Sequence, residues 1–276
     1  MKSHKILFVS QEITPYLPEN EMSVVGRHLP QGIQEEGNMI RTFMPRYGVV
    51  NERRYQLHEV IRLSGMNLIM EDTDHPLIIK VASIQTARMQ VYFIDNEEYF
   101  HRKFTLKDLK NKDFKDNDER TVFFARGVLE TVKKLRWSPD IVHCIGWFTG
   151  LVPVYLKKAF ADDPLFSNSK IIYSVYNDSF TRPLNKEFRR KLLIEGIKDE
   201  DLSVLKSTGF MDLNKLAIHY ADGIIEGSSE IFPELKSFIK DEDKVCLEYQ
   251  GDENYVSAYS AFYDRILNGT ENAETT

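Results

Sequence analysis

The sequence has little cysteine and no long hydrophobic run, and both absences narrow the class of protein. Only Cys144 and Cys246 occur in 276 residues, and they lie far apart in the chain. Two separated cysteines are typical of reduced thiols in a cytoplasmic protein and not of a disulfide framework. No apolar stretch approaches the roughly 18 residues that a membrane-spanning helix needs. The apolar run at the N-terminus is short and predicts a strand, not a signal peptide. We therefore expect a cytoplasmic protein that does not bind membranes.

The common nucleotide and metal motifs are also missing. The sequence contains no G-x-G-x-x-G, no Walker pattern, no C-x-x-C and no H-E-x-x-H, so neither a dinucleotide nor a zinc ion has motif support. Glu12, Glu19 and Glu21 could gather around a divalent cation, but metal sites need converging ligands and a sequence does not show convergence. A net charge of -6 disfavours nucleic acid as a partner. The prediction is a protein without cofactor, metal or nucleic acid.

What the sequence does contain is an alternation of apolar strands with amphipathic helices. Lys5–Ser10 is a continuous apolar run, typical of a parallel strand that is buried on both faces. Apolar residues then recur at helical spacing over 22–33, and Met39–Gly48 indicates the next strand. The alternation resumes after residue 119. These features predict a Rossmann-like α/β fold with a mostly parallel, doubly wound sheet.

Two segments, residues 55–88 and 103–120, depart from this simple alternation. Residues 55–88 contain short β-type runs with no helix between them, which predicts a small antiparallel insertion before the chain returns to the main sheet at Met89–Asp95. Lys103–Arg120 is dense in charge and is expected to be a solvated loop and helix edge. Helices are expected over Trp147–Phe160 and Pro183–Glu195. We predict one domain over residues 1–268 and a polar tail over 269–276.

Several motifs, taken in order, resemble one family. They are ILFVSQEITPYL from Ile6, VVG with LP at Val24–Pro30, MPRYG at Met44–Gly48, PDIVHCIGWFTGLVPVYL at Pro139–Leu156, SVYN at Ser174–Asn177, YADGIIEGSSE at Tyr220–Glu230 and ILNG at Ile266–Gly269. This set is similar to the N-terminal, acceptor-side domain of bacterial glycogen synthases and plant starch synthases. The resemblance covers nearly the whole chain. It implies half of a GT-B-type glycosyltransferase and an activity that moves glucose from ADP-glucose to an α-1,4-glucan.

The first departure from the family lies in the loop before the first helix. The family reads K-T-G-G there, and the resemblance implies that the lysine and the glycine N–H groups serve the sugar nucleotide. The aligned residues here are Pro18, Glu19, Asn20 and Glu21, which supply neither a positive charge nor a close backbone approach. The two glutamates could instead favour the start of the helix through its dipole. Either way, ADP-glucose is expected to bind poorly.

The second departure lies after the strand that carries His143. The family's H-D-W-H becomes Ile145, Gly146, Trp147 and Phe148, so only the tryptophan remains. Trp147 and Phe148 follow a strand end, where they could line a cleft or contact a partner. His143 matches the family, although a lone histidine inside a strand is more often a packed residue than a catalyst.

Two further positions complete the candidate cleft. The family's T-V-H-N becomes a motif in which Tyr176 replaces the histidine and Asn177 stays, and Glu12 lies in the opening strand motif. The candidate cleft-lining residues are therefore Glu12, Pro18, Glu19, Asn20, Glu21, His143, Trp147, Phe148, Tyr176 and Asn177. No catalytic residue is assigned.

The resemblance leaves two functions open. In the family a second domain holds most of the nucleotide, and this chain ends where that domain is expected to begin. The first possibility is a glycogen or starch synthase-like glucosyltransferase domain that is degenerate and inactive unless a second protein chain completes the cleft. The second possibility is a non-catalytic relative that binds an α-glucan, a metabolite or a protein through the altered cleft.

Overall fold

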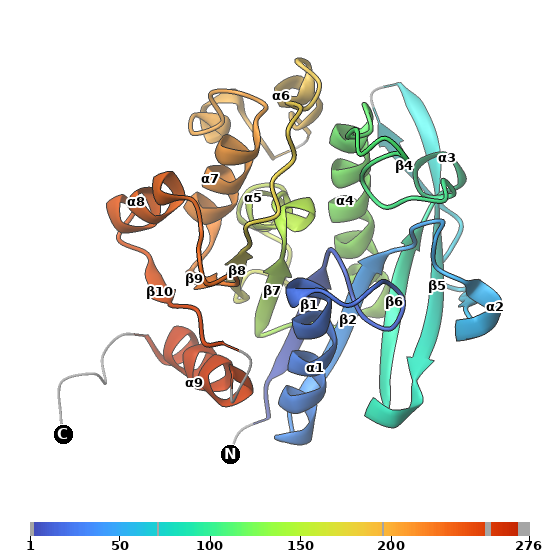
Figure 1. The fold of residues 1–276 in the computed structure, drawn as a ribbon, viewed down its shortest axis with the longest axis horizontal. Helices are drawn as coiled ribbons and strands as arrows, with labels where there is room; N and C mark the ends of the chain where they lie inside the picture. Colours follow the sequence, from blue (N-terminus) through green and yellow to red (C-terminus); the bar gives the residue numbers. More distant parts are fainter. Residues whose placement is uncertain (1–2, 71, 195, 252–254, 270–276) are drawn as a thin grey trace.

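The computed structural model describes residues 3–70, 72–194, 196–251 and 255–269, and these form a ten-stranded sheet covered by helices (Figure 1). The strand order is β10-β9-β8-β7-β1-β2-β6-β5-β3, with β4 paired to β5. The strands of the parallel part are β1 (Lys5–Ser10), β2 (Met39–Pro45), β6 (Met89–Asp95), β7 (Ile141–Ile145), β8 (Lys170–Val175), β9 (Gly223–Glu226) and β10 (Val245–Leu247). This mostly parallel α/β sheet confirms the predicted fold class.

An antiparallel edge extends this sheet. It consists of β3 (His58–Glu59), β4 (Met66–Met70) and β5 (Thr73–Ile84). The insertion predicted over residues 55–88 is antiparallel, but it is not a separate hairpin, because β5 pairs with β6 over seven residues and so belongs to the main sheet. The expected strand character of residues 55–64 is mostly wrong, since β3 has only two residues.

Helices lie on both faces of the sheet. They are α1 (Glu21–Glu35), α2 (Glu52–Tyr55), α3 (Glu97–Phe100), α4 (Asn117–Leu135), α5 (Val152–Lys157), α6 (Phe188–Lys191), α7 (Phe210–Tyr220), α8 (Pro233–Asp241) and α9 (Tyr255–Asn268), with short 3-10 turns at η1 (Gln85–Ala87), η2 (Trp147–Thr149) and η3 (Asp199–Leu202). In Figure 1, α1 and α9 lie side by side in front of the sheet, and α4, α5 and α7 lie behind it. Alternate β1 side chains accordingly enter two cores, with Leu7 and Val9 in one and Ile6 and Phe8 in the other.

Two predicted helices are shorter than expected. In Trp147–Phe160, a 3-10 turn follows Gly146, which has a φ of 85°, and α5 begins only at Val152. Among the described residues of Pro183–Glu195, only α6 is helical, and its Arg189 donates to the carbonyl oxygens of Leu202 and Leu205 in the irregular chain that follows. Most of the predicted tail, residues 270–276, lies outside the described residues.

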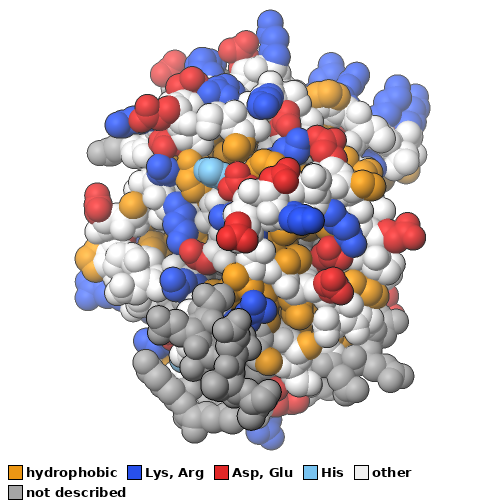
Figure 2. All heavy atoms as spheres, turned by 90° about the vertical axis from the view of Figure 1, so that its left-hand side faces the viewer, with side chains coloured by type: hydrophobic (Ala, Val, Ile, Leu, Met, Phe, Trp, Pro, Cys, Tyr) orange, Lys and Arg blue, Asp and Glu red, His pale blue; other side chains and the backbone are white. Residues whose placement is uncertain are grey.

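The surface of the described part carries mixed charge. On the face that holds α8 and β10, acidic and basic side chains alternate, with small apolar areas between them (Figure 2). This face therefore offers no continuous basic surface of the kind that holds nucleic acid. Within the described ranges, no helix is both long and apolar enough to cross a membrane.

Candidate functional site

The strand order reverses at β1, which has β2 on one side and β7 on the other. Open α/β sheets bind ligands beyond the carboxyl ends of their strands at such a point. Two adjoining pockets lie there, and both are lined by Gln11, Glu12, Asn177 and Asp178. The first, which we call the outer pocket, has a volume of about 420 Å³. The second, which we call the acidic pocket, has a volume of about 230 Å³.

The loop before α1 is closed on itself by a helix cap. Asn20 is the N-cap residue, and its Oδ1 accepts the Ser23 N–H at 2.8 Å while its own N–H donates to Ser23 Oγ at 2.9 Å. Asn20 Nδ2 also donates to Glu12 Oε2 at 2.5 Å. Glu21 occupies the first turn of α1, where negative charge is favourable, so the predicted role of this loop in starting the helix is confirmed for Glu21. The N-terminus of α1 is thus occupied by the chain's own amide oxygen.

Three strand ends meet around the acidic pocket through hydrogen bonds. The backbone N–H of Asn177, after β8, donates to Ser228 Oγ at 3.2 Å, and Ser228 Oγ donates to Glu21 Oε2 at 2.7 Å. After β1, Gln11 Oε1 accepts the Phe148 N–H, while Gln11 Nε2 donates to Asp178 Oδ2, each at 3.0 Å. These contacts hold the wall of the pocket in place without any cationic side chain.

Asp178 is the most perturbed carboxyl group in this wall. Its pKa is raised to about 7, mainly by burial and also by the negative charge of Glu12, while the Gln11 hydrogen bond and Lys107 act to lower it. Its Oδ1 is enclosed and has no hydrogen-bond partner. At neutral pH this carboxyl group is therefore partly protonated.

The predicted cleft residues separate into three groups. Glu12, Asn20, Glu21, Tyr176 and Asn177 line the acidic pocket, and Trp147 lines only the outer pocket. Pro18 and Glu19 are exposed and line neither pocket, although the Pro18 carbonyl oxygen accepts from Ser23 Oγ. His143 and Phe148 lie in the interior.

The two interior residues have structural partners. His143 is fully buried between Tyr263 OH and Ser174 Oγ, each 2.7 Å from a ring nitrogen, and burial lowers its pKa to about 3. Its place among the cleft-lining residues was wrong, because the side chain points from β7 into the core that α9 covers. Phe148 is likewise fully buried beside Tyr47 and Phe124. It contributes its backbone N–H to the site, not its ring.

The aromatic residues that do line the pockets are enclosed. Trp147 is only 2% exposed and packs edge-on against Phe180, with ring centroids 4.6 Å apart. Tyr176 is 3% exposed, and its ring lies against Gly227, where an added Cβ would come within 2.5 Å of the ring. Neither ring therefore forms an open platform for stacking.

The loop expected to be solvated is anchored by a buried cation. Arg120 is fully buried and donates to the carbonyl oxygens of Tyr99 and Thr105 and to Asn117 Oδ1. Burial lowers its pKa to about 10. The prediction that Lys103–Arg120 is simply a solvated segment is wrong at this end, because the guanidinium holds in place the loop that lines the outer pocket.

Charge is one-sided in the acidic pocket but mixed in the outer pocket. The acidic pocket is lined by the carboxylates of Glu12, Glu21 and Asp178, and no lysine, arginine or histidine is among its described lining residues. The outer pocket contains Lys107, which lies 3.9 Å from Asp113 and so faces a carboxylate of its own. Within the described ranges, no group of three or more His, Cys, Asp or Glu residues is arranged to hold a metal ion.

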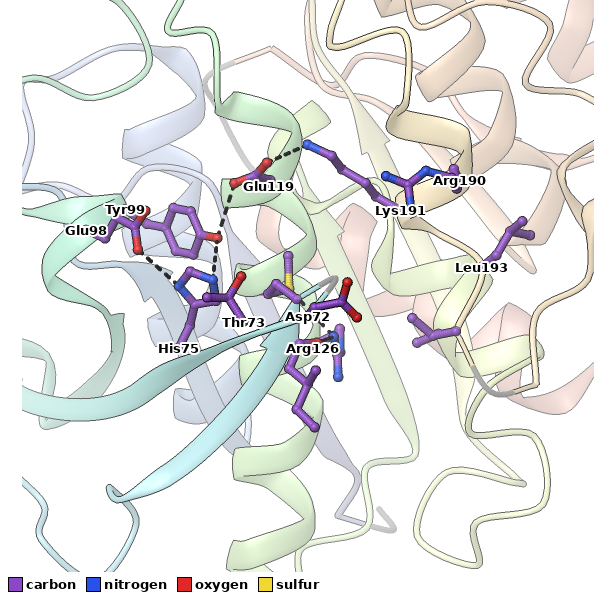
Figure 3. A pocket seen from close by; sticks show the side chains of 13 residues that line it. Asp72, Thr73, His75, Glu98, Tyr99, Glu119, Arg126, Arg190, Lys191 and Leu193 are labelled. Carbon is purple, nitrogen blue, oxygen red and sulfur yellow. Dashed lines mark hydrogen bonds and ion pairs between the residues drawn. The ribbon is translucent and has the colours of Figure 1, made fainter.

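A larger pocket, about 500 Å³, lies elsewhere, between the β4–β5 hairpin, α4 and α6. We call it the hairpin pocket. Figure 3 shows two of its paired groups: Lys191 points to Glu119, and His75 lies between Glu98 and Tyr99. The size of this pocket does not make it the better site, because Lys191, Glu119 and His75 are already engaged by other side chains of the protein.

Sequence reasoning missed Gln11, Asp178, Ser228 and Lys107. Gln11 and Asp178 are adjacent to the predicted Glu12 and Asn177 at strand ends, so the rule that selected their neighbours could have selected them. Ser228 and Lys107 gave no such signal, since their place depends on how distant loops fold back over the sheet.

Comparison with known proteins agrees with this fold. The family described as "Starch synthase catalytic domain" matches residues 5–244. A glycogen synthase of Chlorobium limicola is 38% identical over 177 residues, which are 64% of this chain and 36% of that protein. A glycogen synthase of Chlorobaculum parvum is 34% identical over 224 residues, 80% of this chain and 45% of that protein. The chain thus spans less than half the length of these relatives.

One solved structure shows the same fold. It is the catalytic domain of starch synthase IV from Arabidopsis thaliana bound to ADP and acarbose, with a TM-score of 0.69 and 16% identity, covering 90% of this chain and 51% of that one.

Proposed function

The chain belongs to the starch synthase catalytic domain family, and we propose that it is a glycogen synthase-like glucosyltransferase domain whose own cleft wall does not hold the donor's diphosphate. By itself this polypeptide is then inactive in glucose transfer. The proposal takes the reaction class from the family and the loss of donor binding from the residues of the cleft.

One observation supports this proposal above the others: the N-terminus of α1 is capped at Ser23 by Asn20 and is acidic. A helix N-terminus binds phosphate through free N–H groups and its positive dipole end. Here Asn20 already accepts the Ser23 N–H, and Glu21 adds a negative charge at the same place. A carboxylate about 5 Å from a phosphate charge costs roughly 3 kcal/mol at an effective dielectric constant near 20.

The experiment is a calorimetric titration with ADP-glucose, paired with an assay of labelled glucose transfer to maltoheptaose. We expect no saturable binding of ADP-glucose below millimolar concentration and no transfer. The same titration is made on a variant that carries Pro18→Lys, Glu19→Thr, Asn20→Gly and Glu21→Gly. Glu59→Lys, on the edge strand β3, serves as the control for a change of charge elsewhere. Sub-millimolar binding of ADP-glucose by the unmodified protein would overturn the proposal.

The second candidate function is non-catalytic binding of an α-glucan in the outer pocket. It is favoured by the side chains there, since Gln11, Asn177 and Asp113 offer amide and carboxyl groups that hydrogen-bond sugar hydroxyls. Maltoheptaose titrated against the protein and against Asn177→Ala tests it. Saturable binding of maltoheptaose that is weaker in the variant supports this function. If neither ADP-glucose nor maltoheptaose binds, a protein partner becomes the better candidate.

A further inference from the structure

A further pocket, about 490 Å³ in volume, lies between α1 and α9, beyond the carboxyl ends of β9 and β10. The two helices that enclose it lie side by side in front of the sheet (Figure 1). We call it the tyrosine pocket, because Tyr249, Tyr255 and Tyr259 line it. Val24, Val25 and Glu21 of α1 form the facing wall. The pocket is therefore mostly aromatic and aliphatic, with a carboxylate at one side.

Two of the tyrosine rings stand as adjoining walls. Tyr255 and Tyr259 are four residues apart and so share a face of α9. Their ring centroids are 5.9 Å apart, and the ring planes meet at 73°. Tyr249 and Tyr255 are only partly buried, whereas Tyr259 is 4% exposed. Accessible aromatic surface is thus supplied by Tyr249 and Tyr255, and Tyr259 supports them from behind.

The charge of the tyrosine pocket comes from Glu21. Among the described lining residues there is no lysine, arginine or histidine. Burial raises the pKa of Tyr259, so that this phenol is neutral at physiological pH. Glu21 is exposed, and its Oε2 accepts from the neutral hydroxyl of Ser228, which leaves the negative charge of the carboxylate in place. A ligand therefore meets neutral rings beside one negative charge.

This combination favours one chemical class of ligand. The faces of aromatic rings attract cations, and aromatic cages are a common means of recognising quaternary ammonium groups. Methyl groups on the nitrogen also pack well against tyrosine rings and valine side chains. A metal ion would need several converging oxygen ligands, and no such group is found in the described ranges. A neutral ring compound would gain nothing from Glu21.

The tyrosines come from a part of the chain that the family match does not include. That match covers residues 5–244, so Glu21, Val24 and Val25 lie inside it, whereas Tyr249, Tyr255 and Tyr259 lie beyond it. The tyrosine pocket is therefore built by adding a tyrosine-bearing segment to the family's α/β core. An inference about this pocket does not rest on the proposed function of the cleft.

We propose that the tyrosine pocket binds the alkylated ammonium group of a small soluble compound of the choline type. The ammonium group lies against the rings of Tyr249 and Tyr255, and Glu21 supplies the opposite charge. A volume of about 490 Å³ equals roughly 16 water molecules, so the pocket also has room for the rest of such a molecule.

The test is calorimetry at low salt with choline, 3,3-dimethyl-1-butanol and ethanolamine. The alcohol has the shape of choline without its charge, and ethanolamine has the charge without the methyl groups. We expect choline to bind about tenfold more tightly than either compound, since both the charge and the alkyl groups contribute. Glu21→Gln should weaken choline binding and leave the alcohol unchanged. Glu35→Gln, at the exposed far end of the same helix, should change neither.

The tyrosines are tested by variants that separate the ring from its hydroxyl group. Tyr255→Leu should weaken choline binding about tenfold, because it keeps an apolar side chain but removes the ring. Tyr255→Phe keeps the ring and should retain most of the affinity. Tyr55→Leu, at a partly buried tyrosine on α2, is the matched control and should leave the affinity for choline unchanged. If Tyr255→Leu lowers the melting temperature, Tyr249→Leu replaces it.

Several results would overturn the inference. Absence of choline binding, or equal affinities for choline and the alcohol, would leave no role for the charge. Equal affinities for choline and ethanolamine would reveal a general attraction for cations, and an unaltered choline affinity in the tyrosine-to-leucine variant would place the ligand elsewhere. Cosedimentation with phosphatidylcholine vesicles without binding of free choline would assign the pocket to a membrane lipid and not to a soluble compound. Binding of ADP-glucose would overturn the proposed function and leave this inference untouched.

Discussion

The hairpin pocket and the acidic pocket are both lined by carboxyl groups, but among their described lining residues only those of the hairpin pocket include cations. Lys191 is 6% exposed and bridges Asp118, which is 1% exposed, to Glu119. In the acidic pocket, Asp178 Oδ2 accepts a hydrogen bond from the neutral amide of Gln11 and not from a cation. The ion pairs of Lys191 join α6 to α4. The carboxyl groups of the acidic pocket have no such cation and could interact with a ligand.

The pKa shifts express the same difference. Burial would lower the pKa of Lys191, but its hydrogen bonds to Asp118 and Glu119 raise it overall. Burial raises the pKa of Asp118, and Lys191 opposes this change without cancelling it. For Asp178, burial and the charge of Glu12 act in the same direction. Asp118 is thus paired with a cation and serves the structure, whereas Asp178 is not paired with a cation and could act on a ligand.

We expect the largest change in the free energy of unfolding from Lys191→Met. The variant leaves the Asp118 carboxyl group buried without its cation, and such a break costs about 3–5 kcal/mol of unfolding free energy. Urea denaturation at pH 7 measures it. Lys198→Met, whose pair with Glu200 is exposed, is the control and should cost less than about 1 kcal/mol. Equal losses in both variants would mean that the buried cation is not what joins α6 to α4.

Asp178→Asn is expected to raise the free energy of unfolding, whereas Lys191→Met is expected to lower it. Because the folded-state pKa of Asp178 is about 7 and the unfolded value is about 3.9, ionisation of this group opposes folding. The wild-type protein should lose stability as the pH rises from about 4 to 7, with the full loss present above 7. The charged groups that act on Asp178 are Glu12 and Lys107, and Gln11 donates to it.

The measurement for Asp178→Asn is unfolding at pH 4 and at pH 8. The variant should match the wild type at pH 4 and exceed it by about 1–3 kcal/mol at pH 8. Asp199→Asn, at an exposed carboxyl group whose pKa is lowered by Arg189, is a control in which no such gain is expected. A loss of stability at pH 8 in Asp178→Asn would show that this carboxylate is compensated after all.

A smaller change in stability is expected when the N-cap of α1 is altered. Asn20→Ala removes the acceptor for the Ser23 N–H and should cost about 1 kcal/mol of stability. Asn20→Ser keeps an acceptor at the cap without placing a second carboxylate against Glu12, and it should restore most of the loss. Thermal unfolding of the two variants checks this prediction, and identical melting temperatures would contradict the role of the cap.

Sequence patterns predicted the parallel part of the sheet well, because buried parallel strands such as Lys5–Ser10 appear as continuous apolar runs. They predicted the segment around α6 poorly, since the hydrogen bonds of Arg189 to distant carbonyl groups decide its shape. At the site, the altered loop of Asn20 and Glu21 was visible in the sequence. The pairing of Gln11 with Asp178 was not, because those residues are 167 positions apart.

The same limit explains His143 and Phe148. A strand-end position indicates the correct edge of the sheet, but it does not say which face a side chain takes or what covers it. Here α9, far along the chain, supplies Tyr263 and closes the surroundings of His143. Contacts of this kind depend on tertiary packing and leave no local pattern.

The central claim, that the cleft presents uncompensated negative charge, is tested most directly by the salt dependence of ADP-glucose binding followed by ¹H–¹⁵N chemical shifts. We predict that no binding is seen at low salt and that any weak binding becomes stronger as sodium chloride screens the repulsion. Sub-millimolar binding at low salt that weakens as salt is added would show an attractive site for phosphate and would contradict the account.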